Sequence, residues 1–409
     1  MKKFVLFNFL LLILLGSFAQ QNRVKNVILM IPAGTSTSVL SVARWHQIYQ
    51  NPSQNTLNID AFIKGLVRTN ASDAPIGDSA PTTACYMTGY PTQTGFVSTY
   101  PVKTDHDLVP VDVTRAYQPL TTLLEASKQL KNKSTGLVFT SEFPHATPAD
   151  CASHTYDRRN YNIIVPQMVH NNVDVVIGGG VSLLKETEQN YLKDKGYDIY
   201  LDDYQGMRAC QKAPMWALYN PTTMPFEMER DPKTTPSLAE MTQKAIDLLS
   251  ADEDGFFLMV EGSKVDWAAH DNDAKTVITD FLAFDKACKV AFDFAQKDQH
   301  TLVVVLPDHG TSAMTIGSVK SNHGYDKLSL QQIMEQLDDF TISSRTMVSK
   351  MKNSDTTEWP ALFQKYYKID LQPAEMAYLQ MASDNDKSSQ PKELRQNNLS
   401  LTEMLSQIV

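Results

Sequence analysis

Two continuous apolar segments that end in acidic residues and histidines constrain the fold of this chain most strongly. The first, FFLMV at 256–260, runs directly into EGSKVDWAAH at 261–270. A short apolar run predicts a buried strand, and open α/β sheets build their functional sites at the carboxyl ends of strands. Asp266 and His270 are four residues apart, so on a helix they share one face. They could bind a transition metal such as zinc there, or form a solvated surface pair.

The second segment favours the metal interpretation. TLVVVL at 301–306 is another β-branched apolar run, and it is followed by Pro307, Asp308 and His309. The chain has only 9 histidines, so two strands that each end in an Asp and a His are unusual. Buried carboxylates and imidazoles cost free energy unless they have partners, and a metal ion is such a partner. We therefore expect a metal centre at this edge of the sheet.

The whole chain has the pattern of an α/β protein. Apolar runs at 24–31, 134–139 and 173–177 alternate with amphipathic segments at 39–49, 121–130, 162–170, 236–250 and 274–296. This alternation predicts a mostly parallel central sheet with helices on both faces. The length of 409 residues and 42% hydrophobic content suit a single domain over 20–409. Net charge is −9 with no basic stripe, which argues against a nucleic-acid partner.

The sequence also supports predictions about both ends of the chain and about two polar stretches within it. Two lysines, an apolar segment and small residues up to Ala19 predict a secretory signal peptide over 1–19, so the protein would be exported, periplasmic or secreted. An uncleaved anchor is the alternative, but the apolar segment is short for a membrane span. Residues 200–235 have little periodicity and are expected to form a surface insertion, and 383–399 an exposed loop. The amphipathic helix at 399–409 has no end signal, which suggests C-terminal truncation.

A serine nucleophile is suggested by IGDSAPTTA at 76–84. Ser79 stands at the start of a small-residue helical run, where free N–H groups favour an anion. The alternative is an ordinary N-cap, formed by Ser79 or by Asp78. A nearby metal could lower the pKa of the serine hydroxyl and make it a nucleophile without a histidine base.

Oxygen and guanidinium groups for a phosphate site follow between 139 and 159. Thr147 precedes Pro148, so it could cap a helix or present its hydroxyl to magnesium, a cation that prefers oxygen ligands. Arg158 or Arg159 could hold a phosphate through two parallel N–H bonds, and the other would be a surface charge. The four cysteines show no spacing that assigns a disulfide.

Together these motifs resemble the alkaline phosphatase family. The matching segments are DSA at 78–80, HATP at 145–148, Arg158, EGSKVDWAAH at 261–270 and DH at 308–309, and they occur in the family order. The resemblance implies a phosphate monoester hydrolase with Ser79 as the nucleophile that becomes phosphorylated. Arg158 would hold the phosphate and Asp78 would orient Arg158.

The same resemblance implies two zinc ions and one magnesium ion. Asp266 and His270 would bind the first zinc, and Asp308 with His309 would bind the second, which activates Ser79. Thr147 and Glu261 would bind magnesium. His145 and Trp267 would lie beside these metals, a combination seen in some bacterial members. Family members are commonly dimers, so a homodimer is also expected.

The chain departs from the family pattern at two places. The turn after 27–31 is Pro32-Ala33-Gly34, where the family has an Asp that bridges the second zinc and the magnesium. The family's His-Thr-Gly motif, which completes the first zinc site, is absent, and His323 is the last histidine. Three hypotheses follow: an active phosphomonoesterase, an impaired member that still binds phosphate or zinc, or a related hydrolase of phosphodiesters or sulfate esters.

Overall fold

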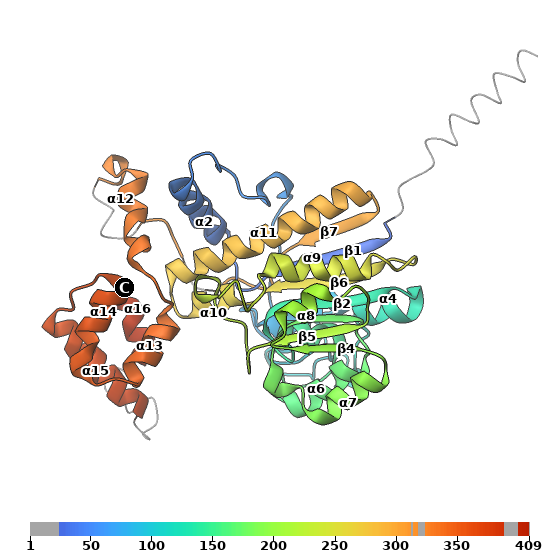
Figure 1. Cartoon of the computed structure of the whole chain (residues 1–409). Coiled ribbons are helices and arrows are strands. Elements are labelled where there is room, and N and C mark those ends of the chain that lie inside the picture. The colour runs from blue at the N-terminus through green and yellow to red at the C-terminus, as the bar shows by residue number, and fades with distance from the viewer. Residues whose placement is uncertain (1–23, 312–313, 318–323, 388–399, 409) are drawn as a thin grey trace, which may run out of the picture.

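A parallel β-sheet forms the centre of the computed structural model, which describes residues 24–311, 314–317, 324–387 and 400–408 (Figure 1). Within these residues the sheet has seven strands in the order β4-β5-β3-β2-β6-β1-β7, and every pair is parallel. The strands are β1 Asn26–Pro32, β2 Ser134–Glu142, β3 Val175–Gly179, β4 Asp198–Leu201, β5 Met215–Tyr219, β6 Phe256–Gly262 and β7 Thr301–Val305. The expected signal peptide at 1–19 lies outside the described residues.

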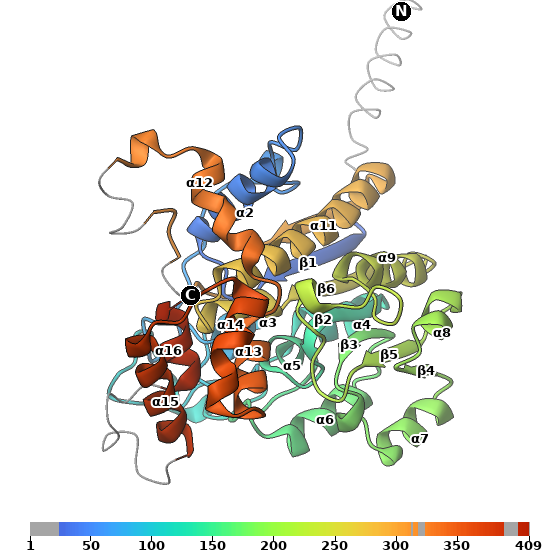
Figure 2. The ribbon, with the colours of Figure 1, turned by 60° about the vertical axis from the view of Figure 1, so that its left-hand side comes forward.

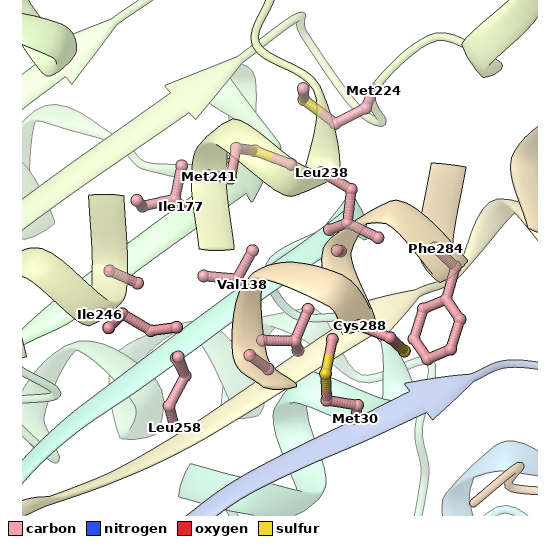
Figure 3. Packing of buried hydrophobic residues seen from close by; sticks show 14 of the residues in the cluster. Met30, Val138, Ile177, Met224, Leu238, Met241, Ile246, Leu258, Phe284 and Cys288 are labelled. Atoms are coloured by element: carbon pink, nitrogen blue, oxygen red, sulfur yellow. The ribbon is translucent and has the colours of Figure 1, made fainter. Parts of the chain in front are cut away.

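Both faces of the sheet are buried. Successive side chains of each strand point to opposite sides, so each strand contributes to the packing on both faces. Met30, Val138, Ile177 and Leu258 pack on one face against helices α9 and α11 (Figure 3). Their chain neighbours, such as Ile31 and Leu137, belong to a second cluster on the other face. This two-sided burial explains why the strands are continuous apolar runs, and it confirms the predicted α/β fold.

Helices cover the two faces in separate groups. On the first face lie α2 Thr37–Gln50, α8 Tyr204–Ala209, α9 Leu238–Leu249, α10 Lys264–His270 and α11 Ala274–Asp298. On the second lie α3 Ser79–Thr88, α4 Leu123–Lys131, α5 Ala146–Ala152, α6 Tyr161–His170 and α7 Glu186–Asp194. Capping boxes begin α4 at Thr122 and α9 at Ser237, where a side-chain oxygen accepts from a free backbone N–H.

A separate helical cluster follows the sheet in the sequence. It contains α13 Ser344–Lys352, α14 Trp359–Tyr367, α15 Pro373–Lys387 and α16 Leu401–Ile408, and it lies to one side of the sheet (Figures 1 and 2). The preceding helix, α12 Leu330–Met334, contacts α2. Helices α13–α16 have their own core, which includes Trp359, Phe363 and Leu405. Arg345 on α13 attaches this cluster to the body through Asp271, with Nε 2.5 Å from Oδ2. The sequence analysis did not anticipate this second core.

Two expectations about polar stretches are wrong. Residues 200–235 are no surface insertion: they contain α8 and β5, and β5 pairs with β3 inside the sheet. Residues 383–387 belong to α15 instead of an exposed loop, with Ser383 buried, while 388–399 lie outside the described residues. The amphipathic helix expected at the end is confirmed as α16.

Two further observations concern the described residues alone. None of the helices found there is both long and apolar enough to cross a membrane. The four cysteines, all of them described, are free thiols, and three of them are buried.

Candidate active site

The predicted site residues gather at the carboxyl ends of four neighbouring strands, β2, β6, β1 and β7. Strand β2 leads to His145 and Thr147 at the start of α5, and β6 ends in Glu261 before α10. Strand β7 leads to Asp308 and His309. Because parallel strands all end at one edge, residues that are far apart in sequence meet there.

Ser79 is the first residue of α3 and is buried, with 4% of its surface exposed. Asp78 is the N-cap of this helix, so the capping alternative holds for Asp78 while Ser79 stays free for other contacts. Ser79 Oγ lies 3.1 Å from the Nε2 atom of His309, a residue 230 positions later in the chain. The structure thus brings the predicted nucleophile to a predicted zinc ligand.

Arg158 is held in place on both sides of its guanidinium. Nη1 forms an ion pair with Asp78 Oδ1, and Nη2 lies 3.2 Å from His145 Nε2. Asp78 Oδ2 also accepts from the Gly95 backbone N–H at 2.9 Å, which fixes the carboxylate. Burial lowers the pKa of His145, so its imidazole is neutral and its Nε2 can accept from Arg158. Asp78 therefore orients Arg158 in the way the resemblance implies.

Asp308 and His309 offer two donor atoms to one ion. Asp308 Oδ2 and His309 Nε2 are 3.5 Å apart, and two ligands of a tetrahedral zinc are separated by about 3.3–3.5 Å. Asp308 Oδ1 accepts from the backbone N–H of Gly34 and of His309. Its Oδ2 is buried and has no hydrogen-bond partner among the described residues. A fully buried carboxylate oxygen without a partner is costly, and a cation would satisfy it.

Asp266 and His270 form the second predicted pair, on α10. Asp266 Oδ1 is 3.5 Å from His270 Nε2, again the separation that one zinc ion requires. Asp266 is buried, whereas the His270 side chain is 63% exposed. The pair therefore lies where the buried site opens to solvent.

Thr311 connects the two pairs, and the sequence analysis missed it. Its hydroxyl donates to Asp266 Oδ1 at 2.5 Å and lies 3.1 Å from His309 Nδ1. Because the single hydroxyl proton goes to Asp266, the His309 Nδ1–H must donate to Thr311, which leaves the Nε2 lone pair to accept from Ser79 Oγ–H or to bind a metal ion. Such outer contacts fix the tautomer and the direction of a metal ligand. The only sequence signal is the position of Thr311 two residues after His309.

Thr147 and Glu261 present oxygen atoms suited to magnesium. Both residues are fully buried, and neither Thr147 Oγ1 nor Glu261 Oε1 has a well-formed hydrogen bond with the described residues. Burial raises the pKa of Glu261 to about 8; the Ser263 and Thr147 hydroxyls oppose this rise, and the nearby Asp308 and Asp266 add to it. Thr147 is inside α5, whose N-cap is His145, so the alternative role of Thr147 as a cap is wrong.

His145 and Trp267, which the resemblance places beside the metals, contact each other. Their rings are in edge-to-face contact with centroids 5.6 Å apart. Lys264 Nζ lies 4.3 Å from the centroid of the same Trp267 ring, and the Arg345 guanidinium lies 5.1 Å from it. Trp267 therefore links the phosphate-binding side to the helical cluster, a contact that the sequence did not reveal.

The turn after β1 contacts both Asp266 and Asp308 through Gly34. Gly34 has φ +61°, and a Cβ there would lie 2.8 Å from Asp266 Cα, so only glycine fits this close approach. Ala33 is buried, with 2% of its surface exposed. Ala33 directly precedes Gly34, whose N–H donates to Asp308 Oδ1, and the family pattern has a carboxylate at this place in the turn.

The residues present fit metal ions in part. Each predicted zinc pair has suitable spacing, and three buried oxygens lack hydrogen-bond partners. However, no three His, Cys, Asp or Glu side chains within the described ranges converge as a complete metal cage.

Comparison with known proteins shows the relationship. The family model described as alkaline phosphatase matches residues 24–398. Alkaline phosphatase 3 of Bacillus subtilis (strain 168) is 37% identical over 312 residues, which are 73% of this chain and 63% of that protein. The chain thus spans about three fifths of the length of such curated relatives.

Solved structures agree with the fold. The crystal structure of a cold-active alkaline phosphatase from a psychrophilic Shewanella sp. matches with a TM-score of 0.75 and 25% identity, covering 94% of this chain and 87% of that one. A mutant of the alkaline phosphatase from the Antarctic bacterium TAB5, with Mg bound in its M3 site, matches with a TM-score of 0.59 and 28% identity, covering 72% of this chain and 81% of that one.

Proposed function

This chain belongs to the alkaline phosphatase family, and on that basis we propose that it hydrolyses phosphate monoesters through Ser79. The observation that supports this proposal most is the meeting of three distant segments of the chain: Asp78 and Ser79 on one, with Arg158 paired to Asp78 and His309 beside Ser79. A guanidinium with two parallel donors suits a terminal phosphoryl group, which has free oxygens to accept both.

In the proposed reaction Ser79 Oγ attacks the phosphorus atom. A bond forms between Oγ and phosphorus, the bond to the alcohol oxygen breaks, and the alcohol leaves with a proton. Water then attacks the phosphoserine, which releases inorganic phosphate and restores the Ser79 hydroxyl. Arg158 orients the phosphoryl group throughout, because Asp78 and His145 fix its guanidinium.

Asp266 with His270 and Asp308 with His309 would hold zinc, and Thr147 with Glu261 would hold magnesium. When bound, these ions supply charge that lowers the pKa of the serine hydroxyl and stabilises the entering and leaving oxygens. Thr311 keeps Asp266 and His309 in the orientation they need for this. The protein supplies the remaining positioning through the rigid strand ends.

A weakened enzyme that still binds phosphate or zinc is the second candidate function. Ala33 favours it, because a buried methyl group replaces the carboxylate that the family places between two metals. The phosphate-binding residues are complete, so phosphate affinity would survive while metal affinity and turnover fall. We also propose export and a homodimer, from the expected signal at 1–19 and from the family resemblance.

The test is turnover of p-nitrophenyl phosphate at alkaline pH with added Zn²⁺ and Mg²⁺. We expect Ser79→Ala to lower kcat by about 1000-fold or more, because the nucleophile is lost. Mass spectrometry after an acid quench should find phosphate on Ser79 of the unaltered protein. Ser127→Ala on α4, a helix that contributes no residue to the site, is the matched control and should keep full activity. Unchanged turnover in Ser79→Ala would reject the nucleophile, and a phosphodiester turned over faster than the monoester would favour the third hypothesis.

A further inference from the structure

The entrance to the phosphate site is a polar pocket with a second arginine. A cavity of about 480 Å³ is lined by Asp78, His145, Arg158, Arg159 and Tyr161. Pockets for small ligands have volumes of about 300–1000 Å³, so this cavity is large enough for the leaving group as well as the phosphoryl group. All five lining residues carry polar groups, so the pocket suits a polar leaving group.

The charges of this lining do not balance. Two arginines face one aspartate among these residues. Asp78 forms an ion pair with Arg158, which compensates that guanidinium. The lining therefore carries a net charge of 2 − 1 = +1, and the excess belongs to Arg159.

Arg159 is fixed through its backbone while its side chain stays uncommitted. Its N–H donates to Asp157 Oδ1 at 2.9 Å, and the N–H of Arg158 donates to Gly95 O at 2.8 Å. These bonds fix the turn from which both guanidinium groups extend. The Arg159 guanidinium makes no hydrogen bond or ion pair with a residue that the structure describes, and the residue is exposed.

We propose that Arg159 binds a second anionic group on the leaving part of the substrate. The favoured substrates would then be phosphate monoesters that carry a carboxylate or a second phosphate a few bonds from the ester oxygen. Arg158 takes the phosphoryl group that is transferred, and Arg159 takes the anion that leaves with the alcohol. A guanidinium suits both anions, because each offers two oxygens to its parallel N–H groups. This inference rests on the proposed function.

A matched pair of substrates tests the inference. 3-Phosphoglycerate and glycerol 3-phosphate have the same primary ester, but only the first carries a carboxylate. We expect a higher kcat/KM for 3-phosphoglycerate than for glycerol 3-phosphate. Arg159→Gln should lower the ratio of these two kcat/KM values by about 5- to 10-fold, mainly by raising KM for 3-phosphoglycerate. Added salt should also reduce the ratio, because an exposed charge is screened. Glycerol 1,3-bisphosphate, compared in the same way, shows whether phosphate is preferred to carboxylate.

Controls separate the outcomes. Arg208→Gln removes the same charge from α8, outside the pocket, and should leave the ratio unchanged. A ratio that is unchanged in Arg159→Gln, or that falls equally in Arg208→Gln, would overturn the inference. If neither compound is hydrolysed with Zn²⁺ and Mg²⁺ present, the proposed function fails. The role of Arg159 is then decided by calorimetry, as the ratio of the dissociation constants of the two compounds in the unaltered protein and in Arg159→Gln.

Discussion

The two halves of the candidate site differ in how far the protein completes them by itself. On the phosphate side, Arg158 is paired with Asp78, contacts His145, and is supported by the segment at 95–98. On the metal side, Thr147 Oγ1, Glu261 Oε1 and Asp308 Oδ2 are buried without hydrogen-bond partners among the described residues. The two halves therefore differ in whether their polar side chains already have partners.

This difference shows what each half needs for its function. A guanidinium paired with a carboxylate is stable before substrate arrives, so the phosphate side is preorganised. Several buried acids near one another, by contrast, repel and are poorly solvated until a cation joins them. By the family resemblance residue 33 belongs to the metal side, so we expect alanine there to weaken the half that already depends on added ions.

The largest expected effect comes from restoring a carboxylate at residue 33. Ala33→Asp should raise affinity for zinc and magnesium by at least about 100-fold, because it adds a charged oxygen ligand beside Asp308. Without metal, the same change should lower the free energy of unfolding by about 2–4 kcal/mol, since it buries another acid. Metal titration and urea denaturation measure the two effects.

Ala33→Asn is the matched control, because it has the size of aspartate without the charge. It should reproduce any steric cost but give little gain in metal affinity. If Asp and Asn behave alike with metal, the missing carboxylate is not what limits the metal side. We also expect a gain in turnover for Ala33→Asp, and a larger one if a third ligand for the first zinc is supplied.

Thr311→Val should have the next largest effect. The isosteric change removes the hydroxyl that orients Asp266 and His309, so zinc affinity should fall by about 10-fold. Thr242→Val, a buried threonine on α9 whose hydroxyl bonds to Leu238 O, is the control and should keep zinc affinity. Equal affinities in the two variants would show that Thr311 does not position the ligands.

The smallest effect is expected on the phosphate side, at His154. Its Nε2 lies 3.0 Å from Glu125 Oε1 and its Nδ1 lies 2.8 Å from Ser98 O, which anchors the segment that leads to Arg158. Burial alone would lower the pKa of His154, but these two acceptors outweigh it and raise the pKa above its ordinary value. The pair therefore stabilises the fold fully just below about pH 6.5, where Glu125 is still charged, and loses this contribution as pH rises through the raised pKa of His154.

His154→Gln should lower the free energy of unfolding by about 1–2 kcal/mol at pH 6 and by much less at pH 9. Urea denaturation at the two pH values measures this. Metal content should not change, because His154 belongs to the preorganised half. A pH-independent loss of stability, or a loss of metal, would contradict the separation of the two halves.

The sequence predicted the elements with strong local patterns. Strands β1, β2, β3, β6 and β7 are apolar runs, and α9 has a capping box and a clear apolar face. Strand β5, MWALY, has no β-branched residue, and β4 has only four residues, so neither is distinct from a loop or a short helix. The core of α13–α16 comes from short helices far apart in sequence, which periodicity does not connect.

The site shows the same limit. Local motifs that match the family pattern predicted Ser79, Arg158 and the paired ligands, because each motif lies within a short segment of the sequence. The role of Thr311 depends on Asp266, 45 residues earlier, and that of Arg159 depends on the pocket around it. Contacts of this kind appear only when the strand ends are brought together.

Metal content is the most direct measure of the proposed difference between the halves. The unaltered protein, Glu261→Gln and Arg158→Gln would each be equilibrated with Zn²⁺ and Mg²⁺, freed of unbound metal and analysed for both elements. We predict that Glu261→Gln loses about one equivalent of magnesium, because a neutral amide replaces a charged oxygen ligand, while Arg158→Gln keeps its metal. Equal metal content in all three proteins, or an equal loss in both variants, would contradict the account.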